Sequence, residues 1–188
     1  MGKIKKHPPV QLFMAVTFNA QAIDESVVLQ EIEKQFGNVE LKSERYDFDA
    51  FTNYYENEMG KGLVKRFISF YKLIDPEDLP DIKIKTNALE KKLSGNDERR
   101  VVNIDPGYLN LSKVVLATTK DYSHRLYLGK GIFGDLHLVF INKTFQTQPW
   151  TYPDYKQPLS IAFFLKLREA YRNKLGEFLE FNLKPERI

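Results

Sequence analysis

The sequence predicts an α+β protein with a ferredoxin-like βαββαβ first half, a β-rich extension and a C-terminal helix packed on the sheet. Two observations lead to this prediction. Strand-like and helix-like runs alternate in the βαββαβ order over residues 8–105, and three further strand-like runs precede a long helical pattern over residues 106–188. Since no Gly- and Ser-rich linker separates the two parts, we expect residues 1–188 to form a single domain.

The first four elements follow from apolar patterning. Val10–Phe18 is an almost continuous apolar, β-rich run and is predicted to be a central strand. Asp24–Phe36 is predicted to be a helix, because an aspartate stands at its capping position and Gly37 follows its last apolar residue. Val39–Phe48 and Leu63–Ile74 are the next two predicted strands, and a long aromatic connector joins them.

A second helix is predicted to begin at Asp75 and Pro76, where a capping side chain is followed by proline at the first helical position. Its apolar positions recur at helical spacing up to Leu93, and Gly95 marks its end. Pro80 conflicts with a regular helix, because it removes a backbone donor in the second turn. We therefore expect the helix to kink or restart there.

The β-rich second half follows a short predicted strand at Arg100–Ile104 and a turn predicted at residues 105–107, Asp-Pro-Gly. Its three predicted strands are Lys113–Thr119, His124–Leu128 and Ile132–Ile141. Residues 144–158 are predicted to form a polar, aromatic loop with three prolines, which leads into the final helix.

Composition excludes several kinds of protein. The chain has no cysteine, which excludes disulfides, thiolate nucleophiles and cysteine-ligated metals, and its three histidines lack the spacing of a metal site, so no metal ligand is predicted. The sequence has no apolar run long enough to span a membrane and no signal-peptide pattern at its start. We therefore expect a cytoplasmic protein that has no membrane partner.

Charge is distributed unevenly along the chain. The formal net charge is +3, yet residues 99–143 hold seven basic and three acidic side chains. The densest polar run of the sequence lies in this basic segment, between Asn103 and Asp135. An anionic ligand is therefore expected in the second half of the chain.

The polar run contains the inventory of a phosphate site. Lys120, His124 and Arg125 are potential cations near one strand-to-strand turn, and glycines at 129 and 131 would let backbone donors approach an anion. The candidate ligand-binding residues are Asp105, Lys113, Lys120, Arg125, Gly129, Lys130, Gly131 and Trp150. Trp150 is included because its ring could stack on a base or a sugar, although aromatic residues in such loops often serve to pin the loop to the core.

His124 is the candidate for general acid or base chemistry, because an imidazole titrates near neutrality. Asp121 is the second candidate catalytic residue, since it or Asp105 could orient the imidazole ring. His137 alternates with leucines in a predicted strand, so we expect it to be solvent-facing or satisfied within the sheet.

Two nucleotide-binding motifs are absent. The sequence contains no GxxxxGK[ST] loop, and Gly129-Lys130-Gly131 lacks both the first glycine at the required distance and the hydroxyl that would bind magnesium. Residues 119–121, Thr-Lys-Asp, lack the intervening residue of the guanine-reading Asn/Thr-Lys-x-Asp motif of GTPases. A P-loop nucleotide hydrolase is therefore excluded.

Three stretches resemble a bacterial family of small proteins that have no assigned function. They are VNIDPGYLNLSKVVLATTKDYSHRLYLGKGIF (residues 102–133), PWTYPDY (residues 149–155) and LPDIKIKTNALE (residues 79–90), and the resemblance extends over nearly the whole chain. Some members of that family are labelled as GTP-binding proteins. The resemblance implies membership of a family without an established activity, cofactor or catalytic residue.

Two hypotheses about function follow. The first is a protein that binds a nucleotide or another phosphorylated small molecule at residues 105–131. The alternative is a non-enzymatic module that binds RNA or a protein, with Phe70 and Tyr71 as candidate stacking residues on the sheet. A homo-oligomer is compatible with both, and no particular cofactor or reaction is predicted.

Overall fold

The computed structural model describes residues 2–95 and 99–182. Its strands are β1 (Val10–Asn19), β2 (Val39–Lys42), β3 (Tyr46–Asp47), β4 (Leu63–Ile74), β5 (Val102–Leu109), β6 (Lys113–Thr118), β7 (Arg125–Gly129), β8 (Ile132–Ile141) and β9 (Thr144–Thr147). Its helices are α1 (Glu25–Phe36), α2 (Glu56–Met59), α3 (Leu79–Ser94), α4 (Pro153–Lys156) and α5 (Pro158–Asn182).

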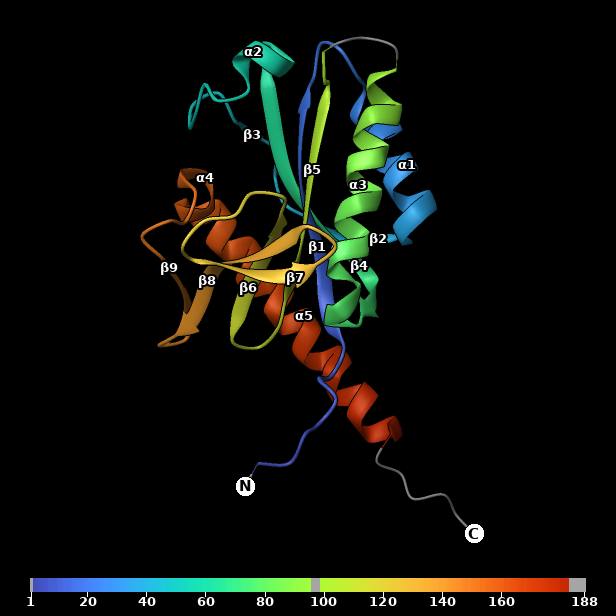
Figure 1. The fold of residues 1–188 in the computed structure, drawn as a ribbon, viewed down its shortest axis with the longest axis vertical. Coiled ribbons are helices and arrows are strands. Elements are labelled where there is room, and N and C mark those ends of the chain that lie inside the picture. Colours follow the sequence, from blue (N-terminus) through green and yellow to red (C-terminus); the bar gives the residue numbers. More distant parts are fainter. Residues whose placement is uncertain (1, 96–98, 183–188) are drawn as a thin grey trace.

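The predicted α+β class and the ferredoxin-like first half are confirmed. The strands of the described chain form one sheet in the order β2-β4-β1-β5-β6-β8-β7, and its pairs are antiparallel. The first four positions, β2-β4-β1-β5, are the strand order of a ferredoxin-like βαββαβ unit. The β-rich extension continues the same sheet through β6 (Figure 1).

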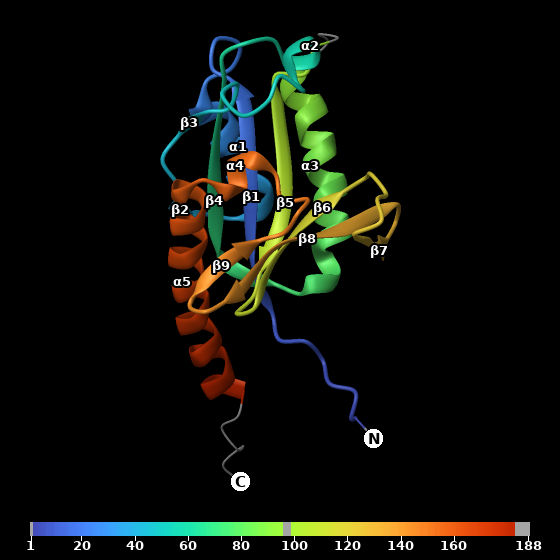
Figure 2. The same cartoon turned by 90° about the vertical axis from the view of Figure 1, so that its left-hand side faces the viewer.

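Alternate residues of β1 face two different cores. Leu12, Met14, Val16 and Phe18 pack with apolar side chains of α1 and α3. Phe13 and Ala15 point to the opposite face and pack with β4, β6, β8 and α5. Figure 2 shows α3 and α5 on opposite sides of the strands, which explains why β1 is apolar on both faces.

The predicted turn at residues 105–107 is wrong, because β5 continues through it to Leu109. Gly107 pairs with Phe13 and Leu116, and a Cβ atom there would lie 2.5 Å from the Val115 carbonyl oxygen and 2.6 Å from the Phe13 ring. Glycine thus permits close strand packing here rather than a turn. Pro106 is tolerated, because β6 pairs with β5 only from residue 107 onward and leaves one edge of β5 open in the described chain.

Other predictions were right in place but incomplete. Strand β4 matches its predicted bounds, and helix α1 begins one residue later than predicted, with Asp24 as its N-cap. The predicted strand Val39–Phe48 is divided into β2 and β3. The aromatic connector contains α2, and the loop at residues 144–158 contains β9 and α4. These short elements lie where apolar periodicity is too brief to be read from the sequence.

The start of α3 explains Pro80. A 3₁₀ turn at Pro76–Asp78 precedes the helix, so Pro80 lies in its first turn, where a backbone donor has no intrahelical partner. The expected restart is therefore found. The Asp75 side chain makes no capping hydrogen bond, contrary to the prediction, and instead pairs with Lys6 at 3.1 Å.

Among the described residues, no helix combines the length and apolar character that crossing a membrane requires.

Candidate functional site

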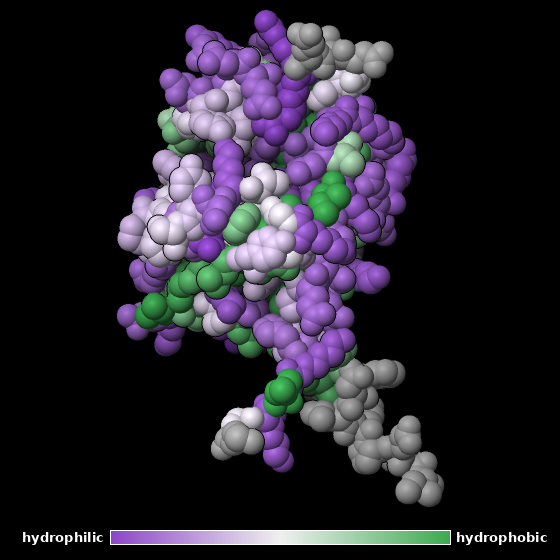
Figure 3. Space-filling model, in the orientation of Figure 1, coloured by the Kyte–Doolittle hydropathy of each residue, from purple (hydrophilic) through white to green (hydrophobic). Residues whose placement is uncertain are grey.

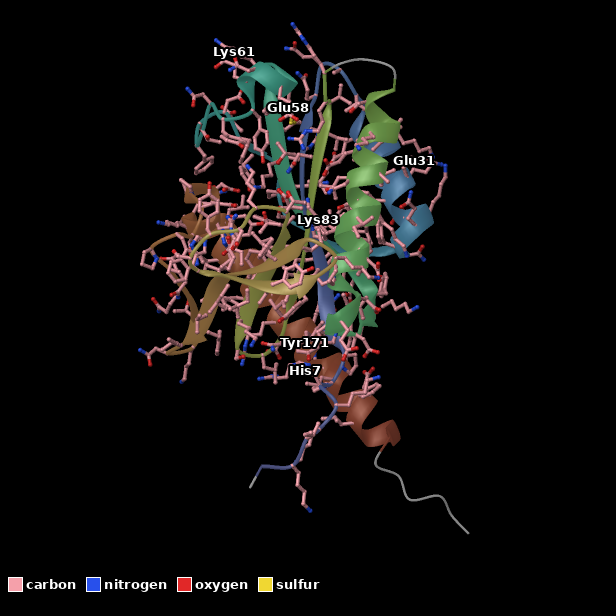
Figure 4. The ribbon with its side chains drawn as sticks, viewed as in Figure 1. His7, Glu31, Glu58, Lys61, Lys83 and Tyr171 are labelled. Atoms are coloured by element: carbon pink, nitrogen blue, oxygen red, sulfur yellow. The ribbon has the colours of Figure 1, made fainter. Side chains whose placement is uncertain are left out.

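A cavity of about 980 Å³ lies where β6 diverges from the open edge of β5. Its walls come from α3, from the start of β7, from the connector before β4 and from the segment around α4. Glu58 on α2 and Lys83 on α3 are two lining residues that come from different elements (Figure 4). The volume is at the upper end of the range for small-molecule sites, which is about 300–1,000 Å³.

The floor of the cavity is a polar row across three strands. Thr17 of β1 pairs with Lys65 of β4 on one side and with Asn103 of β5 on the other. Directly opposed residues of neighbouring strands share a face of the sheet, so the three side chains emerge side by side into the cavity. In the next row, Asp105 lies opposite Ala15 on the same face.

Two ion pairs lie at this floor, one buried and one partly exposed. Lys65 Nζ donates to Asp154 Oδ2 at 2.6 Å, and both side chains are at most 5% exposed. Lys65 also lies over the Phe48 ring, with Nζ 4.6 Å from the ring centre. Lys83 Nζ donates to Asp105 Oδ1 at 2.9 Å and to the Ile104 carbonyl at 3.3 Å. The two lysines are therefore already neutralised within the protein.

Asp105 is held as a carboxylate. Burial raises its pKa, but Lys83 and the Asn103 amide, which donates to Oδ2 at 2.7 Å, together bring the pKa below its usual value. Glu90 shows the opposite balance, because burial raises its pKa although it accepts the Ile104 N–H at 2.7 Å and pairs with Arg100 at 3.1 Å.

A second polar cluster surrounds Asp135 of β8, which lies opposite the start of β7. Asp135 Oδ2 accepts from Arg125 Nε at 2.9 Å and lies 3.5 Å from His124 Nε2, while Oδ1 lies 3.2 Å from His137 Nδ1. The backbone N–H of Tyr152 donates to His137 Nε2 at 3.1 Å. His137 is fully buried, so the expectation that it is satisfied within the sheet is confirmed.

The His124 ring stacks with the rings of Trp150 and Tyr122. The ring centres are 4.7 Å and 6.1 Å from that of His124, and the planes are nearly parallel in both pairs. Because Nε2 lies 3.5 Å from Asp135 Oδ2, Nδ1 is the ring nitrogen directed away from that carboxylate. The structure thus places Asp135 beside His124, whereas Asp121 is exposed and does not line the cavity.

Arg125 is committed to the protein interior. Besides Asp135, its guanidinium donates to the Lys120 carbonyl at 3.0 Å and to the Tyr152 hydroxyl at 3.1 Å. Its side chain is 4% exposed. These contacts hold the β6–β7 connection to β8 and to the segment before α4, so Arg125 shapes the wall of the cavity.

Five of the sequence-predicted site residues line the cavity, and five do not. Those that line it are Asp105, Lys120, His124, Arg125 and Trp150. Those that do not are Lys113, Asp121, Gly129, Lys130 and Gly131. Lys113 begins β6, whereas the cavity is lined by the other end of that strand. Residues 129–131 form the end of the β7–β8 hairpin that lies away from the cavity, and Lys130 pairs there with Asp81 at 2.7 Å. Trp150 donates through Nε1 to the Leu136 carbonyl, so it also pins its loop.

Sequence reasoning missed the floor of the cavity. Thr17, Lys65 and Asn103 interrupt apolar strands, and they are buried on the sheet face that also carries Ala15 and Phe67. That pattern, a polar residue on the buried face of a central strand, was the available indication. Asp154 carried no comparable indication, because it lies in a proline-rich loop segment 89 positions from its partner Lys65.

The described residues contain no group of three or more acidic or histidine side chains arranged to hold a metal ion. The arrangement instead offers hydrogen-bond donors, acceptors and aromatic faces around one hollow.

Comparisons with known proteins support the family alone. No curated protein matches the chain, and no solved structure matches it either. A family model described as a domain of unknown function, DUF4416, matches residues 8–171 and so covers both the ferredoxin-like half and most of α5. The chain therefore belongs to the DUF4416 family.

Proposed function

We propose that the cavity binds a nucleotide or another phosphorylated small molecule. The observation that carries this proposal is the position of Lys120, a lysine at the cavity wall to which no described carboxylate is paired. Its Nζ donates to the Tyr54 hydroxyl at 2.6 Å and lies 4.7 Å from the centre of the Tyr54 ring. A phosphate could replace the hydroxyl as a stronger, charged acceptor.

Charge balance around the cavity limits the ligand. Six basic and five acidic side chains line it, and Lys65, Lys83, Arg100 and Arg125 form ion pairs with lining carboxylates. Lys91 and Lys120 are the lining cations that have no such partner within the described chain. Two uncompensated lysines suit one phosphate group better than a triphosphate.

Aromatic side chains provide the remaining contact surface. Tyr54 and Tyr55 come from the connector before β4, Tyr122 comes from the β6–β7 connection, and Trp150 comes from the segment before α4. Flat aromatic faces with polar edges suit a base or a sugar. His124 lines the same cavity and contacts the ligand in this proposal. A cytoplasmic location remains part of the proposal, since the sequence contains no cysteine.

Thermal unfolding in the presence of a ligand panel tests the proposal. The panel contains GMP, GTP and ATP with and without magnesium, inorganic phosphate and a sugar phosphate, and it includes guanine nucleotides because the sequence resembles a family with members labelled GTP-binding. A ligand at about a hundred times its Kd adds roughly 2.7 kcal/mol. At roughly 2–4 °C per kcal/mol for a chain of this size, the midpoint rises by about 5–10 °C. We expect monophosphates to stabilise at least as strongly as triphosphates.

Lys120→Ala is the variant that tests the site, and Lys113→Ala is its control. Loss of a charged hydrogen bond worth about 1.5–3 kcal/mol weakens binding by roughly ten- to a hundredfold. Lys113 lies outside the cavity, so its replacement should leave the ligand-induced shift unchanged. A panel in which no phosphorylated compound raises the midpoint, or equal effects of the two variants, would contradict the proposal. Arg125→Ala is unsuitable, because it breaks buried contacts.

A second candidate function, an interaction module, is supported by strand β7. This strand is last in the sheet order, and its Leu126 and Tyr127 side chains are 75% and 64% exposed. Figure 3 shows hydrophobic side chains gathered over this part of the molecule. A strand with a free edge and apolar side chains suits a protein partner that adds a strand. Phe70, one of the two residues expected to stack on RNA bases, is fully buried against α1 and is therefore not available to RNA.

Salt dependence separates RNA from the proposed small ligand. Binding of a polyanion weakens steeply as salt rises, because counterions are released, whereas binding of a monophosphate in a pocket responds much less.

A further inference from the structure

We propose that the floor of the cavity recognises the hydroxyl groups of a sugar, so that the ligand is a sugar phosphate, free or as the ribose phosphate of a nucleotide. This inference rests on the proposed function and goes further by assigning the two ends of the ligand to two parts of the cavity. The carbohydrate occupies the row Lys65, Thr17 and Asn103, and the phosphate lies toward Lys120 and Lys91.

Thr17 is the first observation behind this assignment. Its side chain is 1% exposed, and within the described chain its Oγ1 has no hydrogen-bond partner, although the residue lines the cavity. A buried hydroxyl without a partner costs about 1–3 kcal/mol. Thr17 also lies toward the end of the central strand β1, at a buried position where valine would satisfy the packing. A ligand hydroxyl would supply the missing partner.

The charge of the floor is the second, independent observation. Lys65 pairs with Asp154, and Lys83 pairs with Asp105, so the floor presents two cations and two anions in close succession. A phosphate placed here would approach both carboxylates and be repelled. A hydroxyl group, in contrast, donates to a carboxylate and accepts from a lysine or threonine at once. The floor thus suits a neutral group with several hydroxyls.

The Asn103 side chain supports the same ligand. Its Nδ2 donates to Asp105 Oδ2 at 2.7 Å, which fixes the orientation of the amide. No hydrogen bond to Oδ1 is found in the described chain, so this oxygen remains an acceptor for a ligand hydroxyl. Phe48 lies next to Lys65 and lines the cavity, and it offers an apolar face to the C–H side of a sugar ring.

Thr17→Val tests the inference, because it removes one hydroxyl and keeps the shape of the side chain. Ser69→Ala is the matched control, since Ser69 Oγ is equally buried and equally without a partner in the described chain but lies outside the cavity. Binding of ribose 5-phosphate, glucose 6-phosphate, GMP, propyl phosphate and inorganic phosphate is measured by isothermal titration calorimetry with both variants and with the unmodified protein.

We expect Thr17→Val to weaken binding of the sugar phosphate or nucleotide that binds best by roughly three- to tenfold, as loss of one neutral hydrogen bond implies. Ser69→Ala should leave that affinity unchanged, and propyl phosphate, which lacks sugar hydroxyls, should bind more weakly and be insensitive to both variants. The comparison of sugar phosphate with propyl phosphate uses the unmodified protein and so does not depend on the folding of any variant.

Two different results would overturn the inference. The first result is that propyl phosphate binds the unmodified protein as tightly as the best sugar phosphate, or that Thr17→Val has the same effect on binding as Ser69→Ala. The floor then does not recognise hydroxyl groups, while the proposed phosphate site stands. If no phosphorylated compound binds at all, the proposed function and this inference fail together.

Discussion

Asp135 organises the interior next to the cavity. Burial raises the pKa of Asp135, but His137 and Arg125 lower it by more than burial raises it. The net pKa is below the usual value, so the carboxyl group stays ionised. His137 is kept neutral, because burial lowers its pKa and its Nε2 accepts the Tyr152 N–H. Each oxygen of the Asp135 carboxylate has a hydrogen-bond partner, Arg125 on Oδ2 and neutral His137 on Oδ1. Both oxygens are therefore satisfied, which explains how Asp135 can be almost fully buried.

Stability should therefore fall in mild acid. The unfolded chain protonates His137 near the ordinary pKa of 6.5, whereas the folded chain, in which that pKa is lowered, does not. The unfolded state thus binds more protons below about pH 6.5, and the free energy of unfolding decreases by up to about 1.4 kcal/mol per pH unit. Urea unfolding between about pH 7.5 and 5 measures this slope.

His137→Asn serves as the comparison, because asparagine can still donate to Asp135 but does not titrate. We expect the variant to be less stable at pH 7.5 and to show a flatter slope. Glu90 has the opposite effect on the slope, because its raised pKa stabilises the folded state as the pH falls. This contribution is the same in both proteins, so it cancels when their slopes are compared. Equal slopes in the two proteins would show that His137 is not the group responsible.

At the scale of elements, β5 determines where the cavity opens. Its second half pairs with both β1 and β6, while its first half pairs with β1 alone among the described strands. Gly107 is the residue at which β5 begins to pair with β6. The backbone of β6 and the Phe13 ring lie too close to Gly107 to leave room for any side chain. The close approach holds β5 and β6 together at one end, and the strands diverge beyond it.

Gly107→Ala should consequently destabilise the sheet. The added methyl group overlaps the Val115 carbonyl and the Phe13 ring, and overpacking of this kind costs about 1–3 kcal/mol. Gly176→Ala on α5 is the control, because a Cβ atom there meets nothing within 4 Å and alanine favours a helix by about 0.5–1 kcal/mol. Denaturant midpoints should move in opposite directions, and a Gly107→Ala protein as stable as the original would contradict the packing described.

At the scale of the molecule, one apolar cluster joins both halves of the chain. It contains Phe13 of β1, Phe67 of β4, Leu116 of β6, Leu138 of β8 and Phe164 of α5. Phe164 is fully buried and lies 5.0–5.8 Å from the rings of Phe13, Phe67 and Tyr155. Because α5 packs on strands from both halves, we expect the ferredoxin-like part and the extension to unfold together.

Calorimetry checks this expectation. The full chain should show one transition whose calorimetric and van't Hoff enthalpies agree. Phe164→Ala should lower the unfolding free energy by about 3–5 kcal/mol without dividing the transition. Two resolved transitions, with residues 8–105 surviving loss of the extension, would show that the chain contains two domains.

Local patterns in the sequence determined most of the fold. The bounds of β4, the helix from a capping aspartate to Gly37, and the restart at Pro80 depend on residues that are neighbours along the chain. The hydrophobic period and the backbone limits of proline and glycine act over a few residues, so one sequence is enough to read them. The βαββαβ order then leaves few topologies, which explains why the ferredoxin-like sheet was predicted correctly.

Tertiary structure decided the site. The sequence predicts a phosphate site at residues 129–131, but these residues lie at the end of the β7–β8 hairpin, outside the cavity. Arg125 lines the cavity, but its guanidinium is already bonded to buried groups of the protein. Lys65 meets Asp154 across 89 positions, and Thr17 gains its neighbours only through strand register. Which polar groups converge, and which are already neutralised, depends on how distant segments pack, and no local period of the sequence carries that information.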